Sequence, residues 1–316
     1  MIIDNGSIDE SWSIIQTFLN NNPILASRSR LVQNKVNLGF ARAHNQALAW
    51  TDSDFVLVLN QDVLLDENYI KACSTCLQKR PDVAAVTGKI LQWNFDSDNF
   101  HPTELKNLQA ISKIDSIGLS IKRNRQVVNL GAGVVDHGQY ESECEVFGVP
   151  GTAPVYRRSA LNEIIQGKEI FDNDFISYKE DVDLAWRLRL AGFNSWYLPQ
   201  AVAYHDRSLG GGNSWQEQIK KRKSWPRDFK IYSWVNHLAV LLKNDSFLNL
   251  FLDLPWIAIQ EFKKAIYLLI FDEGVLRGGL ARLIRLFPVF WGKRRLLKKI
   301  RKIKPIDLRK HWRNVK

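Results

Sequence analysis

The chain has 316 residues, of which 45% are hydrophobic and 24% are charged, a composition typical of a globular protein that buries a sizeable core. The net charge of +11 lies at one end: positions 292–316 contain 12 Lys or Arg and one acid, which leaves 32 basic and 32 acidic residues for positions 1–291. Because this charge is confined to the tail and no nucleic-acid-binding motif is present, a nucleic-acid-binding protein is not expected. Three cysteines cannot build a disulfide framework and predict reduced thiols. Neither a signal peptide nor a membrane-spanning stretch of ~18 apolar residues is expected.

The first 90 residues alternate between strand and helix patterns. In chain order we predict a strand at 1–3, a helix at 12–19, a strand at 29–34, a helix at 41–50, a strand at 55–60, a helix at about 67–79 and a strand at 82–91. This order predicts an α/β fold with a Rossmann-like, mostly parallel sheet and helices on both faces. In such sheets ligands bind beyond the carboxyl ends of the strands.

One acid follows the apolar strand at 55–60. The sequence Asn60-Gln61-Asp62 places Asp62 just past the carboxyl end of this strand, where a binding crevice is expected. A simple turn aspartate would give the same pattern, so both interpretations remain open here.

The middle of the chain contains a hairpin and a charged helix start. The segment 116–133 predicts a hairpin that turns at 122–125. A helix is predicted over about 178–191, with Ser177 and Glu180 as a capping box and Gly192 as its stop. The strand predicted at 194–205 ends at His205.

Four side chains from these segments could share one crevice: Asp62, Glu180, Asp181 and His205. Carboxylate and imidazole groups beside a ligand diphosphate suit Mg²⁺ or Mn²⁺, and a second carboxylate could deprotonate an alcohol. Simpler interpretations stay open. Glu180 could only cap its helix, Asp181 could only interact with the helix dipole, and His205 could be a satisfied polar residue.

From about residue 213 the sequence predicts aromatic and basic helices. Leu280, Leu283, Ile284 and Phe287 share one helix face, and Leu296, Ile300 and Ile303 repeat this spacing among Lys and Arg. Basic amphipathic helices lie on membranes or bind partners. We therefore expect an anionic membrane surface to contact residues 280–316.

Six motifs in this order resemble those of bacterial family-2 glycosyltransferases with the GT-A fold. They are "IIDNGSID", "NLGFARAHNQAL", "VLVLNQDVLL", "GTAPVYRRSAL", "FISYKEDVDLAWRLRLAGF" and "PQAVAYH". The group they resemble most is the rhamnosyltransferase-like branch that builds cell-surface polysaccharides. The resemblance implies a transferase domain at 1–212 and a C-terminal helical, basic extension at 213–316.

The resemblance also implies roles for individual residues. "NQD" stands in place of the family's D-x-D motif with Asn60 at the first acid position, so Asp62 would contact the metal, with His205 as the late ligand. "KED" resembles the catalytic motif, which makes Asp181 the general base and Glu180 its support. The implied nucleotide-binding residues are Asp4, Asn5, Asn37, Gly39, Arg42, Asn45 and Gln61.

These roles imply a metal-dependent, inverting hexosyltransferase that uses Mg²⁺ or Mn²⁺. The expected donor is a nucleoside-diphosphate sugar, with deoxythymidine-diphosphate rhamnose favoured, and the expected acceptor is a glycan or lipid-linked hydroxyl. The expected location is the cytoplasm, peripheral on the inner face of the cell membrane.

The family begins with a further strand and helix, so this chain is expected to start at the second strand. A non-catalytic, degenerate domain that docks on membranes or partners, and a nucleotidyltransferase, remain alternatives.

Overall fold

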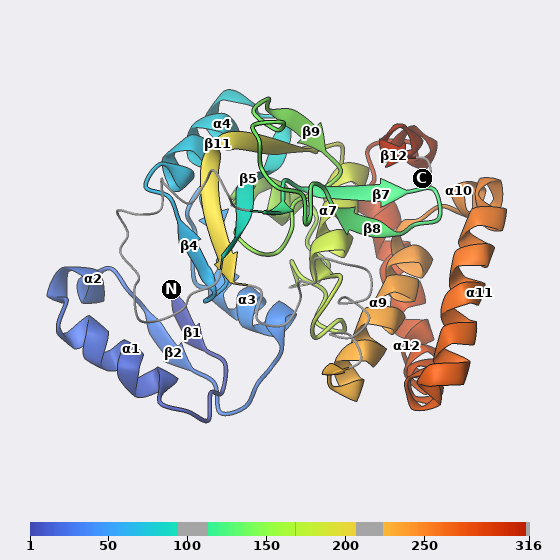
Figure 1. Ribbon diagram of the computed structural model, residues 1–316, viewed down its shortest axis with the longest axis horizontal. Helices are drawn as coiled ribbons and strands as arrows, with labels where there is room; N and C mark the ends of the chain where they lie inside the picture. The colour runs from blue at the N-terminus through green and yellow to red at the C-terminus, as the bar shows by residue number, and fades with distance from the viewer. Residues whose placement is uncertain (94–112, 168, 207–223, 314–316) are drawn as a thin grey trace.

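The computed structural model describes residues 1–93, 113–167, 169–206 and 224–313 (Figure 1). The first part contains, in order, β1 (Ile2–Asp4), α1 (Ser11–Asn20), α2 (Pro23–Ser27), β2 (Leu31–Gln33), α3 (Phe40–Leu48), β3 (Phe55–Leu57), β4 (Val63–Leu65), α4 (Tyr69–Lys79) and β5 (Val83–Trp93). The predicted alternation of strands and helices is therefore confirmed for this part of the chain.

The later elements are β-rich at first and helical afterwards. The middle of the chain forms β6 (Ile114–Ser116), β7 (Leu119–Lys122), β8 (Val127–Asn129), β9 (Cys144–Val146), β10 (Val155–Arg157), α6 (Arg158–Glu163), α7 (Glu180–Leu190) and β11 (Asn194–Asp206). The last part forms α9 (Arg227–Asn244), α10 (Phe247–Leu252), α11 (Leu254–Phe271), α12 (Glu273–Ile300), η3 (Pro305–His311) and β12 (Trp312–Arg313). The pairing of β7 with β8 confirms the predicted hairpin.

A seven-stranded sheet forms the centre of the molecule, and it is mixed. Its order is β3-β10-β5-β11-β4, with β6 paired to β5 and β9 paired to β11. The long strands β5 and β11 are parallel, and β3 runs in the same direction because β10 is antiparallel to both β3 and β5. The first nine residues of β5 are buried, which explains its nearly continuous apolar sequence. The predicted α/β class is confirmed, with antiparallel strands added to the parallel set.

Two strands at the N-terminus stand apart from this sheet. β1 and β2 form a separate parallel pair (Figure 1). The strand predicted at 55–60 is shorter than expected, since β3 ends at Leu57. The next residues still follow the neighbouring chain, because Val58 N donates to Pro154 O (3.0 Å) and Asn60 N donates to Thr152 O (3.1 Å).

The C-terminal helices pack along one edge of the sheet domain. Figure 1 shows α9, α12 and α11 side by side, at the opposite end of the molecule from β1 and β2. Helix α9 contacts both α12 and α7, so it lies between the helical part and the sheet domain. Among the described residues, no helix is both long enough and apolar enough to cross a membrane. The domain boundary predicted at residue 212 lies outside the described residues.

The end of the basic C-terminal extension packs against the rest of the protein. Leu297, Leu308 and Trp312 are buried, and β12 pairs with β7, so that Trp312 lies opposite Ile121. Arg309 Nη1 forms an ion pair with Asp253 Oδ2 (2.8 Å). The end of the chain is therefore part of the core, and deleting residues 292–316 would remove core side chains together with the charges.

Trp312 provides a test of this packing. Its side chain is 8% exposed and lies under the guanidinium of Arg125, 3.6 Å from the ring centroid. We expect Trp312→Ala to lower the free energy of unfolding by about 3–5 kcal/mol in urea titrations, because it leaves a cavity in the core. Trp50 is the matched control, since it also lies under an arginine, Arg30, but is 41% exposed. An equal loss of stability in both variants would contradict the assignment of the tail to the core.

Candidate functional site

Asp62 and His205 lie side by side at one end of the central sheet. The pairing of β4 with β11 aligns His205 with Val63. The backbone N–H of Asp206 donates to the carbonyl of Asp62 (3.0 Å). The Nε2 atom of His205 is 3.5 Å from Asp62 Oδ2, and its Nδ1 atom is 3.0 Å from Asp115 Oδ2. The structure therefore brings the two predicted metal ligands together and adds Asp115, which the sequence analysis missed.

Two carboxylates make this position favourable for a positive charge. Burial alone would lower the pKa of His205, but its hydrogen bonds to Asp115 and Asp62 outweigh burial and raise the pKa to about 9. Burial alone would raise the pKa of Asp62, whereas the hydrogen bond and charge of His205 lower it. The carboxylate of Asp62 and a cation beside it therefore stabilise each other.

The donor atoms at this position fit a divalent cation that is shared with a ligand. Within the described residues, Asp62 Oδ1 is buried and has no hydrogen-bond partner. Asp115 holds the Nδ1 side of His205, so Nε2 faces Asp62, an arrangement that is usual for metal-binding histidines. With a pKa of about 9, Nε2 is protonated at neutral pH, and a metal ion would have to replace this proton. The described parts of the chain contain no group of three or more His, Cys, Asp or Glu side chains that could hold a metal. Oxygen atoms of a bound substrate would therefore have to complete the coordination.

Asp181, the second residue of α7, faces the turn before β10. The backbone N–H of Gly151 donates to Asp181 Oδ2 (3.3 Å). The next residue of this turn, Thr152, accepts from the backbone N–H of Asn60 (3.1 Å). One short turn thus contacts both Asp181 and the segment that leads to Asp62, so these two predicted sites belong to the same region.

The predicted capping box at the start of α7 is wrong. The N-cap residue is Lys179, whose backbone is left-handed (φ 71°), and no side chain caps this helix. Glu180 is only 8% exposed, and among the described residues its Oε2 atom has no hydrogen-bond partner. The simpler interpretation of Glu180 as a helix cap is therefore excluded, and Glu180 is a buried carboxyl group next to Asp181.

Burial changes the acidity of both carboxyl groups. It raises the pKa of Glu180 to about 8, and the negative charge of Asp181 adds to this effect. It also raises the pKa of Asp181, although the positive charge of Lys179 opposes the rise. A carboxylate with a raised pKa is a stronger base, which suits the acceptance of a proton near neutral pH.

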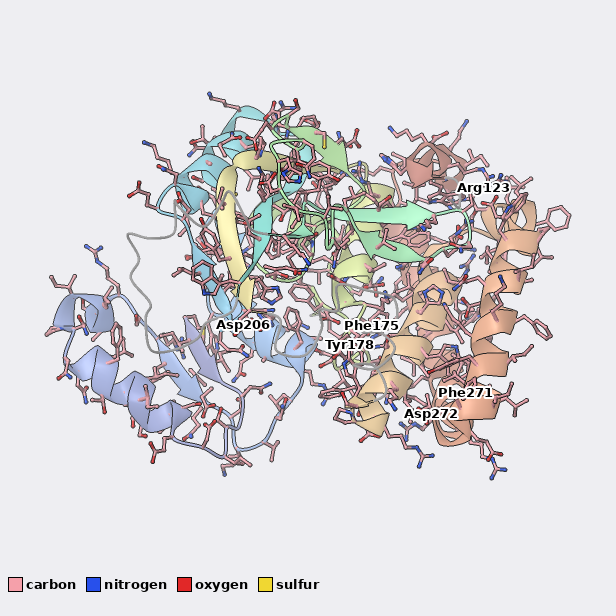
Figure 2. All side chains as sticks on the ribbon, viewed as in Figure 1. Arg123, Phe175, Tyr178, Asp206, Phe271 and Asp272 are labelled. Carbon is pink, nitrogen blue, oxygen red and sulfur yellow. The ribbon has the colours of Figure 1, made fainter. Side chains whose placement is uncertain are left out.

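Asn236 of α9 holds the segment that leads into α7. Its Nδ2 group donates to three backbone carbonyls, those of Phe175 (2.8 Å), Ser177 (2.9 Å) and Tyr178 (2.9 Å). Figure 2 labels Phe175 and Tyr178 of this segment. The same segment has positive φ values at Ile176, Tyr178 and Lys179, which is costly for residues other than glycine. We refer to residues 175–179 as the held segment, because a side chain from the C-terminal helices maintains its conformation.

Three of the residues implied to bind the nucleotide form one hydrogen-bonded group. Asn5 Nδ2 donates to Asn37 Oδ1 (3.0 Å), which also accepts from the backbone N–H of Gly39 (2.8 Å). Gly39 has a φ of +82°, and a Cβ atom there would lie 2.6 Å from the carbonyl oxygen of Ile176. The loop with Asn37 and Gly39 therefore touches the held segment directly.

The other implied nucleotide-binding residues differ in their surroundings. Asp4 is buried and accepts hydrogen bonds from the backbone N–H of Ser7 and from Gln33 (both 3.1 Å). Asn45 ties α3 to residues 170–173, since it donates from Nδ2 to the Phe171 carbonyl (2.7 Å) and the Asn173 side chain (2.9 Å). Its Oδ1 atom accepts from the backbone N–H groups of Ile170 (3.1 Å) and Phe171 (2.9 Å). Asn45 thus serves the fold, and its contact with a nucleotide stays a prediction.

Arg42 and Gln61 are exposed and available to a ligand. A cavity of about 570 Å³ lies between β1, α3 and β3, and its lining includes Asn5, Asn60 and Gln61. These polar residues stand at the carboxyl ends of β1 and β3, which is where an α/β sheet binds its ligand.

Sequence reasoning missed three residues that support this site: Asp115, Asn236 and Lys243. Asp115 lies in the short strand Ile114–Ser116, whose sequence gives no local signal of its role. Lys243 follows a run of apolar helix residues, and its Nζ atom is buried between Asp172 Oδ2 (2.5 Å) and Asp183 Oδ1 (2.7 Å). For Lys243 the available signal was an isolated charge after an apolar run.

Comparison with known proteins identifies the family. A family model described as glycosyl transferase family 2 matches residues 1–165. This chain belongs to glycosyl transferase family 2. The family assignment agrees with the resemblance that the six motifs indicate, and with the α/β fold.

Individual relatives in the family are distant. The chain is 23% identical over 273 residues to poly-beta-1,6-N-acetyl-D-glucosamine synthase of Staphylococcus epidermidis, with 86% of this chain and 53% of the relative covered. The chain thus spans about half the length of the curated relatives it matches. Among solved structures it is similar to GalNAc-T7 with UDP, GalNAc and Mn²⁺ (12% identity, TM-score 0.49, 75% of this chain and 44% of that chain). It is also similar to a mannosyltransferase of Pyrobaculum calidifontis with GDP-Man and Mn²⁺ (15% identity, TM-score 0.46, 94% and 75%).

Replacing Asn236 tests how the held segment is maintained. We expect Asn236→Ala to lower the free energy of unfolding by about 2–4 kcal/mol, because the hydrogen bonds from one buried side chain to three carbonyl groups are lost. Asn22→Ala is the control, since Asn22 Nδ2 donates to only one carbonyl, that of Phe18 (2.8 Å), at an exposed position. Urea titrations of both variants make the comparison, and equal losses would show that Asn236 has no special role.

The raised pKa of Glu180 predicts a dependence of stability on pH. The folded state holds a proton on this group up to about pH 8, whereas the unfolded chain releases it near the usual pKa of 4.5. The free energy of unfolding therefore falls as the pH rises through this window. Glu180→Gln lacks this loss, so its free energy of unfolding relative to the parent should rise by on the order of 2–4 kcal/mol from pH 5 to pH 8. Urea titrations at both pH values measure the gain. Glu10→Gln controls for the loss of one exposed charge, and a gain that does not change with pH would contradict the assignment.

Proposed function

We propose that this chain is an inverting, metal-dependent glycosyltransferase. It moves a sugar from a nucleoside-diphosphate donor to a hydroxyl group of a cell-surface glycan or a lipid-linked acceptor. Membership of glycosyl transferase family 2 supports the reaction class. The observation that carries the proposal is the turn before β10, which contacts both Asp181 and the segment leading to the Asp62–His205 pair.

The proposed reaction replaces one bond at the anomeric carbon with another. Asp181 accepts the proton of the acceptor hydroxyl, and the raised pKa of this carboxyl group favours that step. The acceptor oxygen bonds to the anomeric carbon from the side opposite the diphosphate, while the bond to the diphosphate oxygen breaks. The configuration inverts and the nucleoside diphosphate leaves. Glu180 adjoins Asp181 as its supporting residue, and its raised pKa keeps it protonated near neutral pH.

Asp62 and His205 would hold Mg²⁺ or Mn²⁺, which when bound neutralises charge on the leaving diphosphate. Asp115 orients His205 for this role. Asn5, Asn37 and Gly39, with Arg42 and Gln61, would contact the nucleotide at the cavity between β1 and β3. The contacts proposed for Asp4 and Asn45 are indirect, because their polar atoms bond within the protein.

The donor sugar is proposed to be a deoxyhexose such as rhamnose, carried by deoxythymidine diphosphate. The motifs that resemble the rhamnosyltransferase-like branch support this choice. The curated relative is named for an N-acetylglucosamine polymer, so the uridine-linked N-acetylhexosamine is the second donor to be tested. Either donor suits an enzyme of envelope polysaccharide synthesis.

Two further expectations remain proposals. The first is a peripheral position on the cytoplasmic face of the cell membrane, with an anionic lipid surface as partner. The second is an additional strand beside β1. In the described residues β1 pairs with β2 and β3 pairs with β10, and no strand lies between β1 and β3.

Variants at the two carboxylates test the proposed chemistry. We expect Asp181→Asn to keep metal-dependent nucleotide binding and to slow release of the nucleoside diphosphate by about 10²–10⁴-fold. Asp62→Asn should weaken the metal-dependent part of binding by roughly tenfold or more. Calorimetric titration with the diphosphates of uridine and deoxythymidine, with and without Mn²⁺, measures binding, and donor turnover is measured in parallel.

Asp66→Asn is the matched control, since Asp66 follows β4 at the surface and accepts from the backbone N–H of Asn68. Full turnover in Asp181→Asn would overturn the assignment of the base. No nucleotide binding by the parent chain would favour the alternative, a non-catalytic domain that docks on membranes or partners.

A further inference from the structure

Helix α11 carries an exposed apolar stripe along its length. Ile259, Phe262, Ile266 and Leu269 recur at intervals of three or four residues, so they share one face of the helix. Their side chains are 56%, 67%, 40% and 58% exposed. Figure 1 shows α11 as the outermost of the C-terminal helices, which agrees with this exposure. Isolated exposed apolar residues are common, but a continuous stripe marks an interaction surface.

The stripe continues over α10 and reaches α12. The exposed apolar residues of α10 are Phe247, Leu248, Phe251 and Leu252. The ring of Phe247 lies 6.1 Å from that of Trp291, which in turn stacks on Phe287 at 5.9 Å. Aromatic side chains therefore join the ends of α10 and α12 into one surface.

A cavity of about 520 Å³ opens at the α10 end of this surface. Its lining combines the rings of Phe247 and Trp291 with four cations, Arg294, Arg295, Lys298 and Arg301, and it contains no carboxylate. Arg294 bonds the carbonyls of Leu242 (2.7 Å) and Asp245 (2.6 Å). In the parts of the chain that the structure describes, none of the four cations forms an ion pair with an acid. The charges of Arg295, Lys298 and Arg301 are therefore uncompensated by ion pairs, whereas the nearby charge of Asp245 acts on Arg294.

We propose that α10, α11 and α12 dock on an anionic lipid bilayer, with a phosphate headgroup in the cationic cavity and the apolar stripe at the level of the upper acyl chains. Basic residues next to exposed Trp, Phe and Leu are the features that hold helices in a membrane interface. The uncompensated charge selects a lipid surface over an apolar protein partner. The proposal deepens the proposed function, on which it rests only in placing the enzyme near a lipid-linked acceptor.

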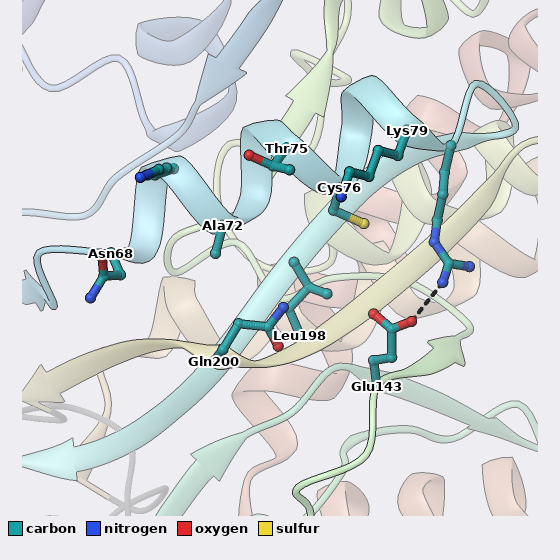
Figure 3. Close-up of a pocket in the computed structure, with 10 residues that line it drawn as sticks. Asn68, Ala72, Thr75, Cys76, Lys79, Glu143, Leu198 and Gln200 are labelled. Carbon is teal, nitrogen blue, oxygen red and sulfur yellow. Dashed lines mark hydrogen bonds and ion pairs between the residues drawn. The ribbon is translucent and has the colours of Figure 1, made fainter.

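A second basic pocket, beneath α4, provides a control for the cationic cavity. The pocket beneath α4 has a similar volume of about 550 Å³ and is lined by Lys71, Lys79 and Arg80 (Figure 3). Its Arg80 forms an ion pair with Glu143 (2.6 Å), drawn as a dashed line, so part of the charge is compensated. Among the described residues of α4, Ile70 is the one exposed large hydrophobic side chain, so the pocket serves as a matched control surface.

Vesicle sedimentation of the full chain tests the cationic cavity. Vesicles of phosphatidylcholine are used with and without phosphatidylglycerol, and we expect binding only to the anionic vesicles, weakened by salt. Each basic residue near such a surface contributes about a fivefold factor, so Arg295→Gln with Lys298→Gln should weaken binding by roughly thirtyfold. Lys71→Gln with Lys79→Gln removes the same charge from α4 and should leave binding unchanged. Equal weakening in both double variants would overturn the proposal.

The apolar stripe is tested separately. Phe251→Ser with Phe262→Ser should weaken binding to anionic vesicles by about tenfold or more, whereas Ile14→Ser with Ile24→Ser, at exposed positions of α1 and α2, should have no effect. Soluble glycerol phosphate should compete poorly, because it engages only the cavity. Equally strong competition would reassign the site to a free phosphate ligand. A dimer that separates when Phe251 and Phe262 are replaced would reassign the stripe to a second copy of the chain.

Nucleotide titration of the same variants separates this proposal from the proposed function. The four substituted positions that should weaken vesicle binding are Phe251, Phe262, Arg295 and Lys298. They lie outside the cavity between β1 and β3, so we expect nucleotide binding to be unchanged when vesicle binding is lost. Vesicle binding without nucleotide binding would leave the docking proposal intact and overturn the enzyme assignment.

Discussion

The position of Asp181 depends on the hydrogen bonds that Asn236 donates to the held segment. Three residues of this segment have left-handed backbones, which cost on the order of 1–3 kcal/mol each when the residue is not glycine. A helix would not begin at Glu180 in this orientation unless other contacts compensated that cost. Asn236 donates to three carbonyls of this segment, and buried carbonyls require such donors. The C-terminal helices are therefore required by the candidate site, although they contribute no residue to its chemistry.

A buried ionic network attaches these helices to the sheet domain. Lys243 lies between Asp172 and Asp183, and Lys293 of α12 also reaches Asp172 (2.5 Å). Arg187 completes the neutralisation of Asp183 (2.8 Å). A buried charge without a partner of opposite sign is strongly destabilising. The network consequently allows one orientation of α9 and α12 against α7, and that orientation places Asn236 against the held segment.

The sequence predicted the elements whose signal is local. Long apolar runs located β5 and β11, and the place of Asp62 and His205 after strands indicated that they could meet. Contacts between distant segments were not predictable in this way. Asp115 is 90 residues from His205 in the chain, and no local pattern reports such a pairing. Local rules also misassigned Glu180 as a cap, because burial of the carboxyl group depends on tertiary packing. The packing of Leu297, Leu308 and Trp312 into the core was not predictable for the same reason, since composition does not report tertiary contacts.

Gly39 has a consequence for how this protein can be altered. Its α-carbon approaches the carbonyl of Ile176 so closely that no side chain fits between them, and Ile176 belongs to the held segment. The loop proposed to contact the donor nucleotide and the segment that precedes the proposed base are therefore in direct contact. A side chain at position 39 would displace this segment as well. Under the proposed roles, a change of the loop that alters donor choice would also move the base.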